Sequence, residues 1–243
     1  MRSTWEAAVG LVFPPICQVC GGERAEPGEG YVCGRCRSRP GALRFVQPPY
    51  CERCGLPFEG EITTRFECAN CRELNLAFSQ ARAAMVATPF LLEIIHRYKY
   101  QRALWFEPFL ANLLIRQAAT PIREGGWEAL VPVPLFPVKR REREFNQAER
   151  LGAALAQATG LPLLTTVVRR VVPTRTQTQL NRQERADNMR GAFAPVAGEA
   201  LKGRRVVLVD DVLTTGATTS ACARALLKGG ATEVAVWTLA RGL

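Results

Sequence analysis

Two adjacent carboxylates and a run of small hydroxylic residues stand close together near the end of the chain. The apolar stretch 206–209 leads directly to Asp210 and Asp211, and residues 214–218 follow with the sequence Thr-Thr-Gly-Ala-Thr. A strand that turns into a helix here would offer a phosphate the free N–H groups and the positive dipole end of the helix. Gly216 allows close approach of the backbone, and the threonines add hydroxyl donors. This pattern predicts a site for a phosphate monoester.

The acidic pair indicates which chemical group carries the phosphate of such a ligand. Two neighbouring carboxylates are unfavourable unless something uses them, and a ribose diol with a magnesium ion supplies both donors and positive charge. We therefore interpret Asp210 and Asp211 as ribose contacts and as the catalytic residues. The alternative is that acids and threonines only cap a helix, but one Asp or Thr is enough for a cap.

Eight of the nine cysteines form four C-x-x-C pairs between residues 17 and 71. Two pairs supply the four thiolates of a tetrahedral structural zinc site, so eight ligands predict two sites. The predicted ligands are Cys17, Cys20, Cys33, Cys36, Cys51, Cys54, Cys68 and Cys71. Consecutive pairing would give two successive ribbons, and interleaved pairing is the alternative. An iron–sulfur site and a redox dithiol are the competing interpretations of the same cysteines.

The composition indicates a globular protein with anionic partners. A chain of 243 residues with 47% apolar residues can bury a sizeable core, and a formal charge of +10 favours polyanionic metabolites or DNA. The apolar stretch 7–13 is too short to span a membrane, so we expect no membrane insertion. Without an export signal, the expected location is the cytoplasm, where cysteines stay reduced and metal binding is favoured over disulfides.

The composition changes near residue 75, from a segment rich in Cys, Gly and Pro to one with ordinary apolar periodicity. We expect a small metal-binding module over residues 1–75 and a larger α/β domain over residues 80–243. Periodicity predicts strands over 81–87, 127–133, 162–168, 205–209 and 233–239. It predicts helices over 90–100 and 104–118, from 145 to a C-cap at Gly160, and over 219–228. The closing strand–helix–strand unit favours a parallel sheet flanked by helices.

Two further polar segments are expected to be loops of that domain. Residues 135–144 carry the basic side chains Lys139, Arg140, Arg141 and Arg143 just after a strand, which favours a diphosphate role over a solvated charge run. Residues 169–190 have little apolar periodicity, which is typical of a functional lid. His96 and Cys222 receive no role, because each stands alone in a helical pattern.

Residues 206–218 resemble the 5-phosphoribosyl-1-pyrophosphate (PRPP) motif of type I phosphoribosyltransferases, which is an apolar strand, two acids and a TTGxT-like loop. Further segments narrow the resemblance to the ComF family, competence-associated proteins that join cysteine pairs to a phosphoribosyltransferase domain. These segments are Tyr98-Lys99-Tyr100, residues 131–135 (VPVPL), 143–147 (REFNQ), 177–180 (QTQL) and 185–193. Together they cover nearly the whole chain.

The resemblance implies a type I phosphoribosyltransferase fold behind an N-terminal double zinc ribbon. It implies that the acidic pair binds the ribose, that residues 214–218 bind the 5-phosphate, and that the loop after Pro134 lies near the pyrophosphate. Residues 169–190 would include a mobile hood. The expected PRPP-binding residues are Asp210, Asp211, Val212, Leu213, Thr214, Thr215, Gly216, Ala217, Thr218, Lys99, Arg141 and Arg143.

The chain departs from the family pattern at two places where the family usually has glycine. Glu144 stands before Phe-Asn-Gln, and Gln101-Arg102 follow Lys99-Tyr100. A glutamate that pointed into a pyrophosphate site would repel the ligand.

Two functions compete on this evidence. The first is an enzyme that uses Mg²⁺ and PRPP, with a nucleobase or amine as acceptor. The second is a non-catalytic competence factor that binds single-stranded DNA, works with other competence proteins and uses the phosphoribosyl site as a ligand sensor. A third function, transcriptional regulation, would need a recognition helix, and none is evident.

Overall fold

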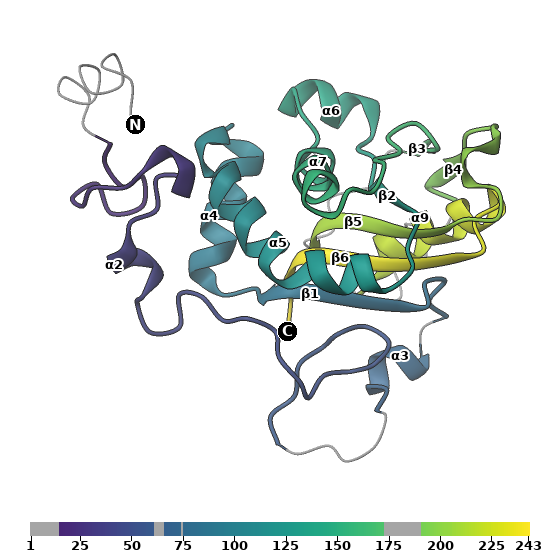
Figure 1. Ribbon diagram of the computed structural model, residues 1–243, viewed down its shortest axis with the longest axis horizontal. Helices are drawn as coiled ribbons and strands as arrows, with labels where there is room; N and C mark the ends of the chain where they lie inside the picture. Colours follow the sequence, from purple (N-terminus) through teal and green to yellow (C-terminus); the bar gives the residue numbers. More distant parts are fainter. Residues whose placement is uncertain (1–14, 61–65, 74, 173–190) are drawn as a thin grey trace. The chain divides into compact units, whose positions relative to one another are not determined.

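The computed structural model describes residues 15–60, 66–73, 75–172 and 191–243 of the chain (Figure 1). Its backbone contacts define two compact units. One unit holds the described residues up to Arg44 together with residues 88–112, and the other holds residues 45–87 and 113–243. The first cysteine ribbon therefore belongs to one unit, and the second ribbon belongs to the other.

A parallel sheet forms the framework of the second unit, with strand order β1-β6-β5-β2 in the described part of the chain. Its strands are β1 (Gln80–Val86), β2 (Ala129–Pro132), β5 (Arg205–Leu213) and β6 (Glu233–Arg241). Strands β5 and β6 are mostly apolar and buried, as expected when helices cover a parallel sheet. Their pairing runs from Arg205 opposite Glu233 to Leu213 opposite Arg241. The predicted α/β class is confirmed.

Helices α7 (Gln147–Thr159) and α9 (Ala217–Lys228) pack against this sheet. The Asn146 side chain sets the start of α7, because it accepts from the Ala148 N–H and donates to the Val133 carbonyl at the end of β2. Gly160 ends α7 in the left-handed conformation, with φ of 76°, as the sequence predicted. This unit also contains two short helices, α3 (Ala69–Glu73) and the 3₁₀ turn η4 (Glu199–Leu201).

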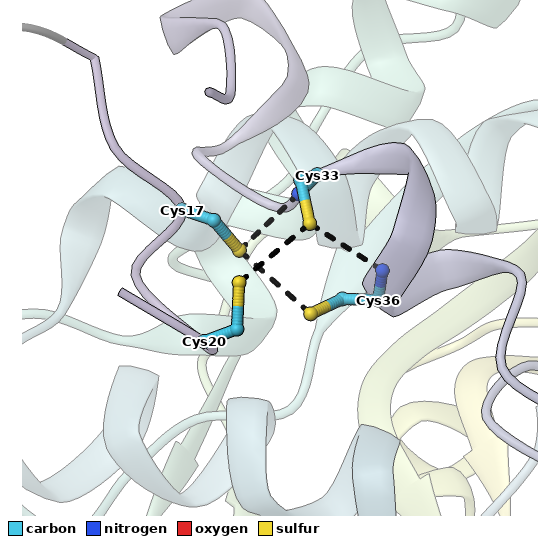
Figure 2. A group of neighbouring side chains, drawn as sticks. All are labelled: Cys17, Cys20, Cys33 and Cys36. Carbon is cyan, nitrogen blue, oxygen red and sulfur yellow. Dashed lines mark hydrogen bonds between the residues drawn. The ribbon is translucent and has the colours of Figure 1, made fainter. Parts of the chain in front are cut away.

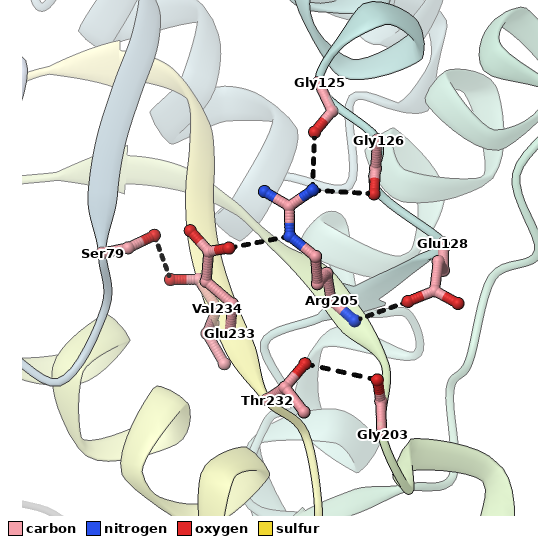
Figure 3. Close-up of polar contacts among 9 residues, drawn as sticks. All are labelled: Ser79, Gly125, Gly126, Glu128, Gly203, Arg205, Thr232, Glu233 and Val234. Carbon is pink, nitrogen blue, oxygen red and sulfur yellow. Dashed lines mark hydrogen bonds and ion pairs between the residues drawn. The ribbon is translucent and has the colours of Figure 1, made fainter.

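An arginine fixes the opening residue of β5 (Figure 3). The Arg205 guanidinium donates to the Glu233 carboxylate at 2.8 Å and to the carbonyls of Gly125 and Gly126, and it stacks over the Trp127 ring. Its own N–H donates to Glu128 Oε2 at 2.9 Å. These contacts hold the amino ends of β5 and β6 together, at the opposite end of the strands from the acidic pair.

The structure corrects a predicted loop and a predicted strand. Residues 135–144 were expected to be a loop, but Pro137–Arg143 form the helix α6, since proline suits the first helical turn. Residues 162–168 were expected to be a strand, but only the short strand β3 (Val168–Arg170) forms, antiparallel to β4 (Phe193–Pro195). Leu163 makes only an isolated bridge to Leu130. Most of the predicted hood, residues 173–190, lies outside the described residues.

The first unit joins the first ribbon to helical segments. It contains η1 (Pro27–Glu29), α2 (Gly34–Arg37), α4 (Pro89–Tyr100), η2 (Leu104–Phe106) and the start of α5 (Glu107–Glu124). The Thr88 hydroxyl caps α4 by accepting from the Leu91 N–H, and it donates to the Ala42 carbonyl at 2.7 Å. Among the described residues, no helix is both long and apolar enough to cross a bilayer.

Candidate functional site

The first four cysteines gather their sulfur atoms around one point (Figure 2). The Sγ atoms of Cys17 and Cys36 lie 3.9 Å apart, and those of Cys20 and Cys33 lie 3.8 Å apart. Backbone N–H groups of Gly22 and then Glu23 lower the pKa of the exposed Cys20 to about 6. These N–H groups favour the thiolate, which is the form that binds metal.

The second four cysteines repeat this arrangement in the other unit. Cys51 and Cys71 approach to 3.7 Å between sulfurs, and so do Cys54 and Cys68. All four side chains are buried, and the Cys68 N–H donates to the Cys51 sulfur at 3.3 Å. Burial alone would oppose thiolates here, so a cation is needed to balance their charge.

Both clusters fit structural zinc. Four sulfurs bound at about 2.3 Å in a tetrahedron lie about 3.8 Å apart, which matches the distances in both groups. The cysteines pair consecutively, so the interleaved alternative is wrong. Each set is closed by four protein ligands and leaves no position for a substrate, which indicates a structural role for the metal.

The acidic pair lies inside a strand rather than in the predicted loop. Strand β5 continues to Leu213, because its pairing with β6 extends that far. Asp210, Asp211, Val212 and Leu213 are therefore strand residues, which corrects the sequence-based expectation of a strand that ends at residue 209 and a loop from 210 to 218. Asp210 is half-buried and Asp211 is buried, and the Asp211 N–H donates to Asp210 Oδ1 at 2.9 Å. Successive strand residues face opposite sides, so the two carboxylates point in different directions.

Residues 214–216 join β5 to α9, and we call them the phosphate loop after their predicted ligand. Gly216 occupies the N-cap position with φ of 83°, a left-handed conformation that glycine adopts without strain. The cap thus lacks a side chain that could accept from the first helical turn. The Thr215 hydroxyl accepts from the Ala217 N–H at 3.4 Å, and the Thr219 hydroxyl donates to the Gly216 carbonyl at 3.1 Å. The positive end of α9 thus lies beside Thr215 and Thr218, which are both half-buried.

Arg170 of β3 is a charged neighbour of Asp210 that the sequence analysis did not single out. Burial lowers the pKa of its guanidinium, the Asp210 carboxylate opposes that shift, and the Arg143 charge adds to it. Arg170 also stacks over the Phe193 ring across the hairpin. Its place within the polar stretch after residue 169 was the available signal, but the hairpin that aims it only appears in the structure. Burial raises the pKa of Cys222, consistent with an inert thiol.

A basic cavity of about 740 Å³ lies between α6 and the β3–β4 hairpin. Arg140, Arg141, Arg169 and Arg170 line it, together with Glu144. The predicted ligand Arg141 thus faces this cavity. The predicted ligand Arg143 instead donates to Gln147 Oε1 at 3.1 Å, within the same segment. Four guanidinium groups around one cavity suit a polyanionic ligand.

The two departures from the family's glycines both fall at left-handed backbone positions. Glu144 ends α6 with φ of 66°, and Arg102 has φ of 53°. Glycine adopts this conformation without strain, whereas other residues are disfavoured there by about 1–2 kcal/mol. A family glycine would therefore fit both backbones better than the residue that this chain carries.

Lys99 belongs to the other compact unit. It is half-buried in the last turn of α4, next to Tyr98, whose hydroxyl contacts the Glu107 carboxylate at 2.9 Å. Its assignment to PRPP stays a prediction, because it rests on the family motif alone. His96 of the same helix is exposed and its ring contacts that of Tyr100.

Comparison with known proteins matches both parts of the chain. Residues 8–74 match the double zinc ribbon domain model, and residues 148–243 match the phosphoribosyl transferase domain model. Competence protein F of Haemophilus influenzae is 34% identical over 79% of this chain and 85% of its own length. The DNA utilization protein YhgH of Escherichia coli K12 is 31% identical over 96% of this chain and 100% of its own. Competence protein ComFC of Bacillus subtilis is 27% identical over 86% and 84%.

Solved structures resemble part of the chain. An adenine phosphoribosyltransferase is 16% identical over 58% of this chain and 75% of its own, with a TM-score of 0.37. A glutamine phosphoribosylpyrophosphate amidotransferase from Bacillus subtilis is 24% identical over 53% of this chain, with a TM-score of 0.35, and the match spans 25% of the amidotransferase.

Proposed function

We propose a function from the premise that this chain belongs to the ComF family, whose members join a double zinc ribbon to a phosphoribosyltransferase domain. The chain binds PRPP at the end of β5 and acts in natural competence, in the uptake and use of DNA. The roles in the names of its relatives, competence and DNA utilization, support the biological part of this proposal.

The observation that carries PRPP binding is the arrangement around the phosphate loop. Asp210 and Asp211 lie in the last part of the apolar strand β5, and α9, capped by Gly216, begins shortly after that strand ends at Leu213. The acids would accept hydrogen bonds from the ribose hydroxyls, and the first turn of α9 with the threonine hydroxyls would bind the 5-phosphate. The ribose would thus face hydrogen-bond acceptors, and the 5-phosphate would face hydrogen-bond donors.

The basic cavity suits the diphosphate. Arg141 lines it, and Arg170 connects it to the neighbourhood of Asp210. Carboxylate oxygens fit Mg²⁺, which would supply positive charge to the diphosphate when bound. These arginines would balance the charge of a departing pyrophosphate, so that transfer or hydrolysis at the anomeric carbon needs no protein nucleophile. The acceptor would be a nucleobase or an amine.

Isothermal titration calorimetry of PRPP and Mg²⁺ tests the proposal. Wild-type protein should bind, and the double variant Asp210→Asn, Asp211→Asn should lose at least roughly a hundredfold in affinity, as expected when two charged hydrogen-bonding groups are removed. Zinc content and thermal unfolding of the same samples show whether the variant is folded. Zinc-loaded wild type that binds no PRPP would overturn the proposal.

A second variant acts in the opposite direction. Glu144 lines the basic cavity and has a left-handed backbone. Glu144→Gly removes a negative charge from the diphosphate side and relieves the backbone, so it should raise PRPP affinity and stabilise the protein by about 1 kcal/mol. Glu142→Gln on the exposed side of the same helix is the matched control for charge alone. If Glu144→Gly and wild type bind PRPP with equal affinity, the basic cavity is not part of the PRPP site.

The alternative function is a single-stranded DNA-binding factor that uses PRPP as a signal. The net charge of +10 and the relatives' link to DNA utilization favour it. Fluorescence anisotropy with a labelled oligonucleotide, at several salt concentrations and with or without PRPP, separates the two. Salt-sensitive binding that changes with PRPP, without release of pyrophosphate in the presence of acceptors, would favour the sensor. Absence of DNA binding would exclude it.

A further inference from the structure

Arg241 is a buried arginine that contacts both the second ribbon and the phosphate loop. It ends β6, and only 2% of it is exposed. Its Nε donates to the Cys54 carbonyl at 3.1 Å, and its Nη2 donates to the Cys54 sulfur at 3.4 Å. Its Nη1 donates to the carbonyls of Leu213 at 3.1 Å and Thr214 at 2.7 Å, and also to that of Gly242. A single side chain therefore joins a metal ligand to the residues that begin the phosphate loop.

The charge of this guanidinium has an unusual counterion. A buried arginine normally pairs with a carboxylate, yet all of the partners of Arg241 among the described residues are carbonyls and one thiol sulfur. Four cysteine thiolates around one divalent ion carry a formal charge of about −2. The zinc-bound second site thus supplies the negative charge that Arg241 needs, and Arg241 offsets part of the charge of the site.

The contacts with Leu213 and Thr214 set the direction of the loop backbone. A trans peptide holds its carbonyl and its N–H on opposite sides of the chain. Because Arg241 holds the carbonyls of Leu213 and Thr214, the N–H groups of Thr214 and Thr215 turn away from it. The same residues lead to Gly216 and the start of α9, where N–H groups are offered to a ligand.

The segment that leaves the second ribbon supports the loop from another side. The Arg53 guanidinium, within the Cys51–Cys54 knuckle, donates to the Leu76 carbonyl at 2.7 Å. Leu76 and Phe78 are buried directly beneath Gly216, where a Cβ would lie 3.5 Å from each side chain. The Ser220 hydroxyl of α9 accepts from the Ala77 N–H at 3.0 Å. The ribbon thus reaches the loop by two independent routes.

We propose that Arg241 is a positioning residue that couples the second zinc site to the phosphate loop. Metal in the site of Cys51, Cys54, Cys68 and Cys71 holds Arg241, and Arg241 holds the loop ready for a 5-phosphate. The identity of that ligand rests on the proposed function, whereas the order of the loop without ligand does not. By linkage, a ligand that binds the ordered loop also strengthens zinc binding at this site.

Hydrogen–deuterium exchange of the full-length, zinc-loaded protein without PRPP tests the contact. In Arg241→Gln, the amides of residues 213–217 should exchange faster by on the order of tenfold. Arg205→Gln is the matched control, since it removes an arginine from the opposite end of the same strand pair, and it should leave these amides unchanged. Unchanged exchange in a folded Arg241→Gln would overturn the proposal.

Two further measurements test the coupling if Arg241→Gln does not fold. Arg241→Lys keeps the charge but cannot reach both groups of acceptors at once, so exchange in the loop should rise while both zinc ions stay bound. In the wild type, a chelator should remove zinc from the second site more slowly when PRPP and Mg²⁺ are present. Unchanged loop exchange in Arg241→Lys would overturn the coupling. Equal rates of zinc loss with and without PRPP would also overturn it, provided that calorimetry shows that PRPP binds. Wild type that binds no PRPP would instead overturn the proposed function and leave the exchange result standing.

Discussion

The two ribbons have nearly the same local structure but different surroundings. The glycine after each first cysteine pair, Gly21 or Gly55, donates to the carbonyl of Cys17 or Cys51, at 2.8 Å in both. In both ribbons the N–H of the third cysteine donates to the first sulfur at 3.3 Å. The metal geometry is thus decided locally, by hydrogen bonds within each knuckle.

The surroundings distinguish them. Cys20 of the first ribbon is exposed, whereas all four cysteines of the second are buried. The second ribbon joins the parallel sheet of its unit, since the Ala81 N–H of β1 donates to the Arg53 carbonyl at 2.8 Å and Arg241 of β6 contacts Cys54. The same motif can therefore be a local metal-binding element in one place and part of the framework of a parallel sheet in another.

The largest expected effect is the loss of one buried metal ligand. Cys51→Ser should destabilise the unit that contains the sheet by at least about 4 kcal/mol, because it removes a metal site on which that core is built. Cys17→Ser, at the equivalent position of the first ribbon, should leave the unfolding of the sheet unit nearly unchanged. Thermal unfolding by circular dichroism, with zinc content as the check on each site, measures both. Equal destabilisation of the sheet would contradict the difference between the ribbons.

The two knuckle glycines offer a matched steric comparison. Both have positive φ, 70° at Gly21 and 65° at Gly55, so alanine strains either backbone by about 1–2 kcal/mol. A Cβ at Gly21 meets nothing within 4 Å, but at Gly55 it would lie 2.7 Å from the Ala81 carbonyl oxygen. Gly55→Ala should therefore be the more destabilising by about 1–3 kcal/mol in urea unfolding. The comparison fails if Gly21→Ala is equally harmful.

The rate of zinc loss should also separate the sites. The exposed Cys20 gives a chelator access to the first site, whereas the second is buried. Zinc release followed with a chromogenic chelator should show two phases of one zinc each, differing in rate by roughly tenfold or more because local opening is easier at exposed sites. The fast phase should be missing in Cys17→Ser. Its survival in that variant would assign it to the second ribbon.

The smallest effect concerns ion pairs at the edge of each ribbon. Arg82 of β1 contacts the Glu52 carboxylate at 3.1 Å and stacks over Tyr50, while Arg37 and Glu29 of the first ribbon meet at 2.8 Å. Glu52→Gln should destabilise by about 0.5–1 kcal/mol and Glu29→Gln by about 0–0.5 kcal/mol, because the Arg82 side chain is more buried. Midpoints of urea unfolding give both values, and the reverse order would contradict the tighter attachment of the second ribbon.

Much of the metal sites and of the segment around the acidic pair could be predicted from the sequence. The spacing of the cysteines identified all eight metal ligands, because a knuckle is made by residues that are neighbours along the chain. The apolar run before Asp210 predicted a strand that carries the acidic pair into a glycine-containing turn and a helix, and this order is found. Local patterns of this kind depend on contacts within a few residues.

Other features required the tertiary structure. The end of β5 at Leu213 depends on pairing with β6, and the helix α6 replaced a predicted loop. The consecutive pairing of cysteines was one of two possibilities until their sulfur atoms were placed. Arg170 and Arg241 carry no motif of their own, and each matters because the fold brings it against residues that are distant in sequence. Residue types and their spacing thus identify the candidate ligand groups. The packing of distant segments then decides which charges meet, because burial holds an arginine side chain in a fixed contact.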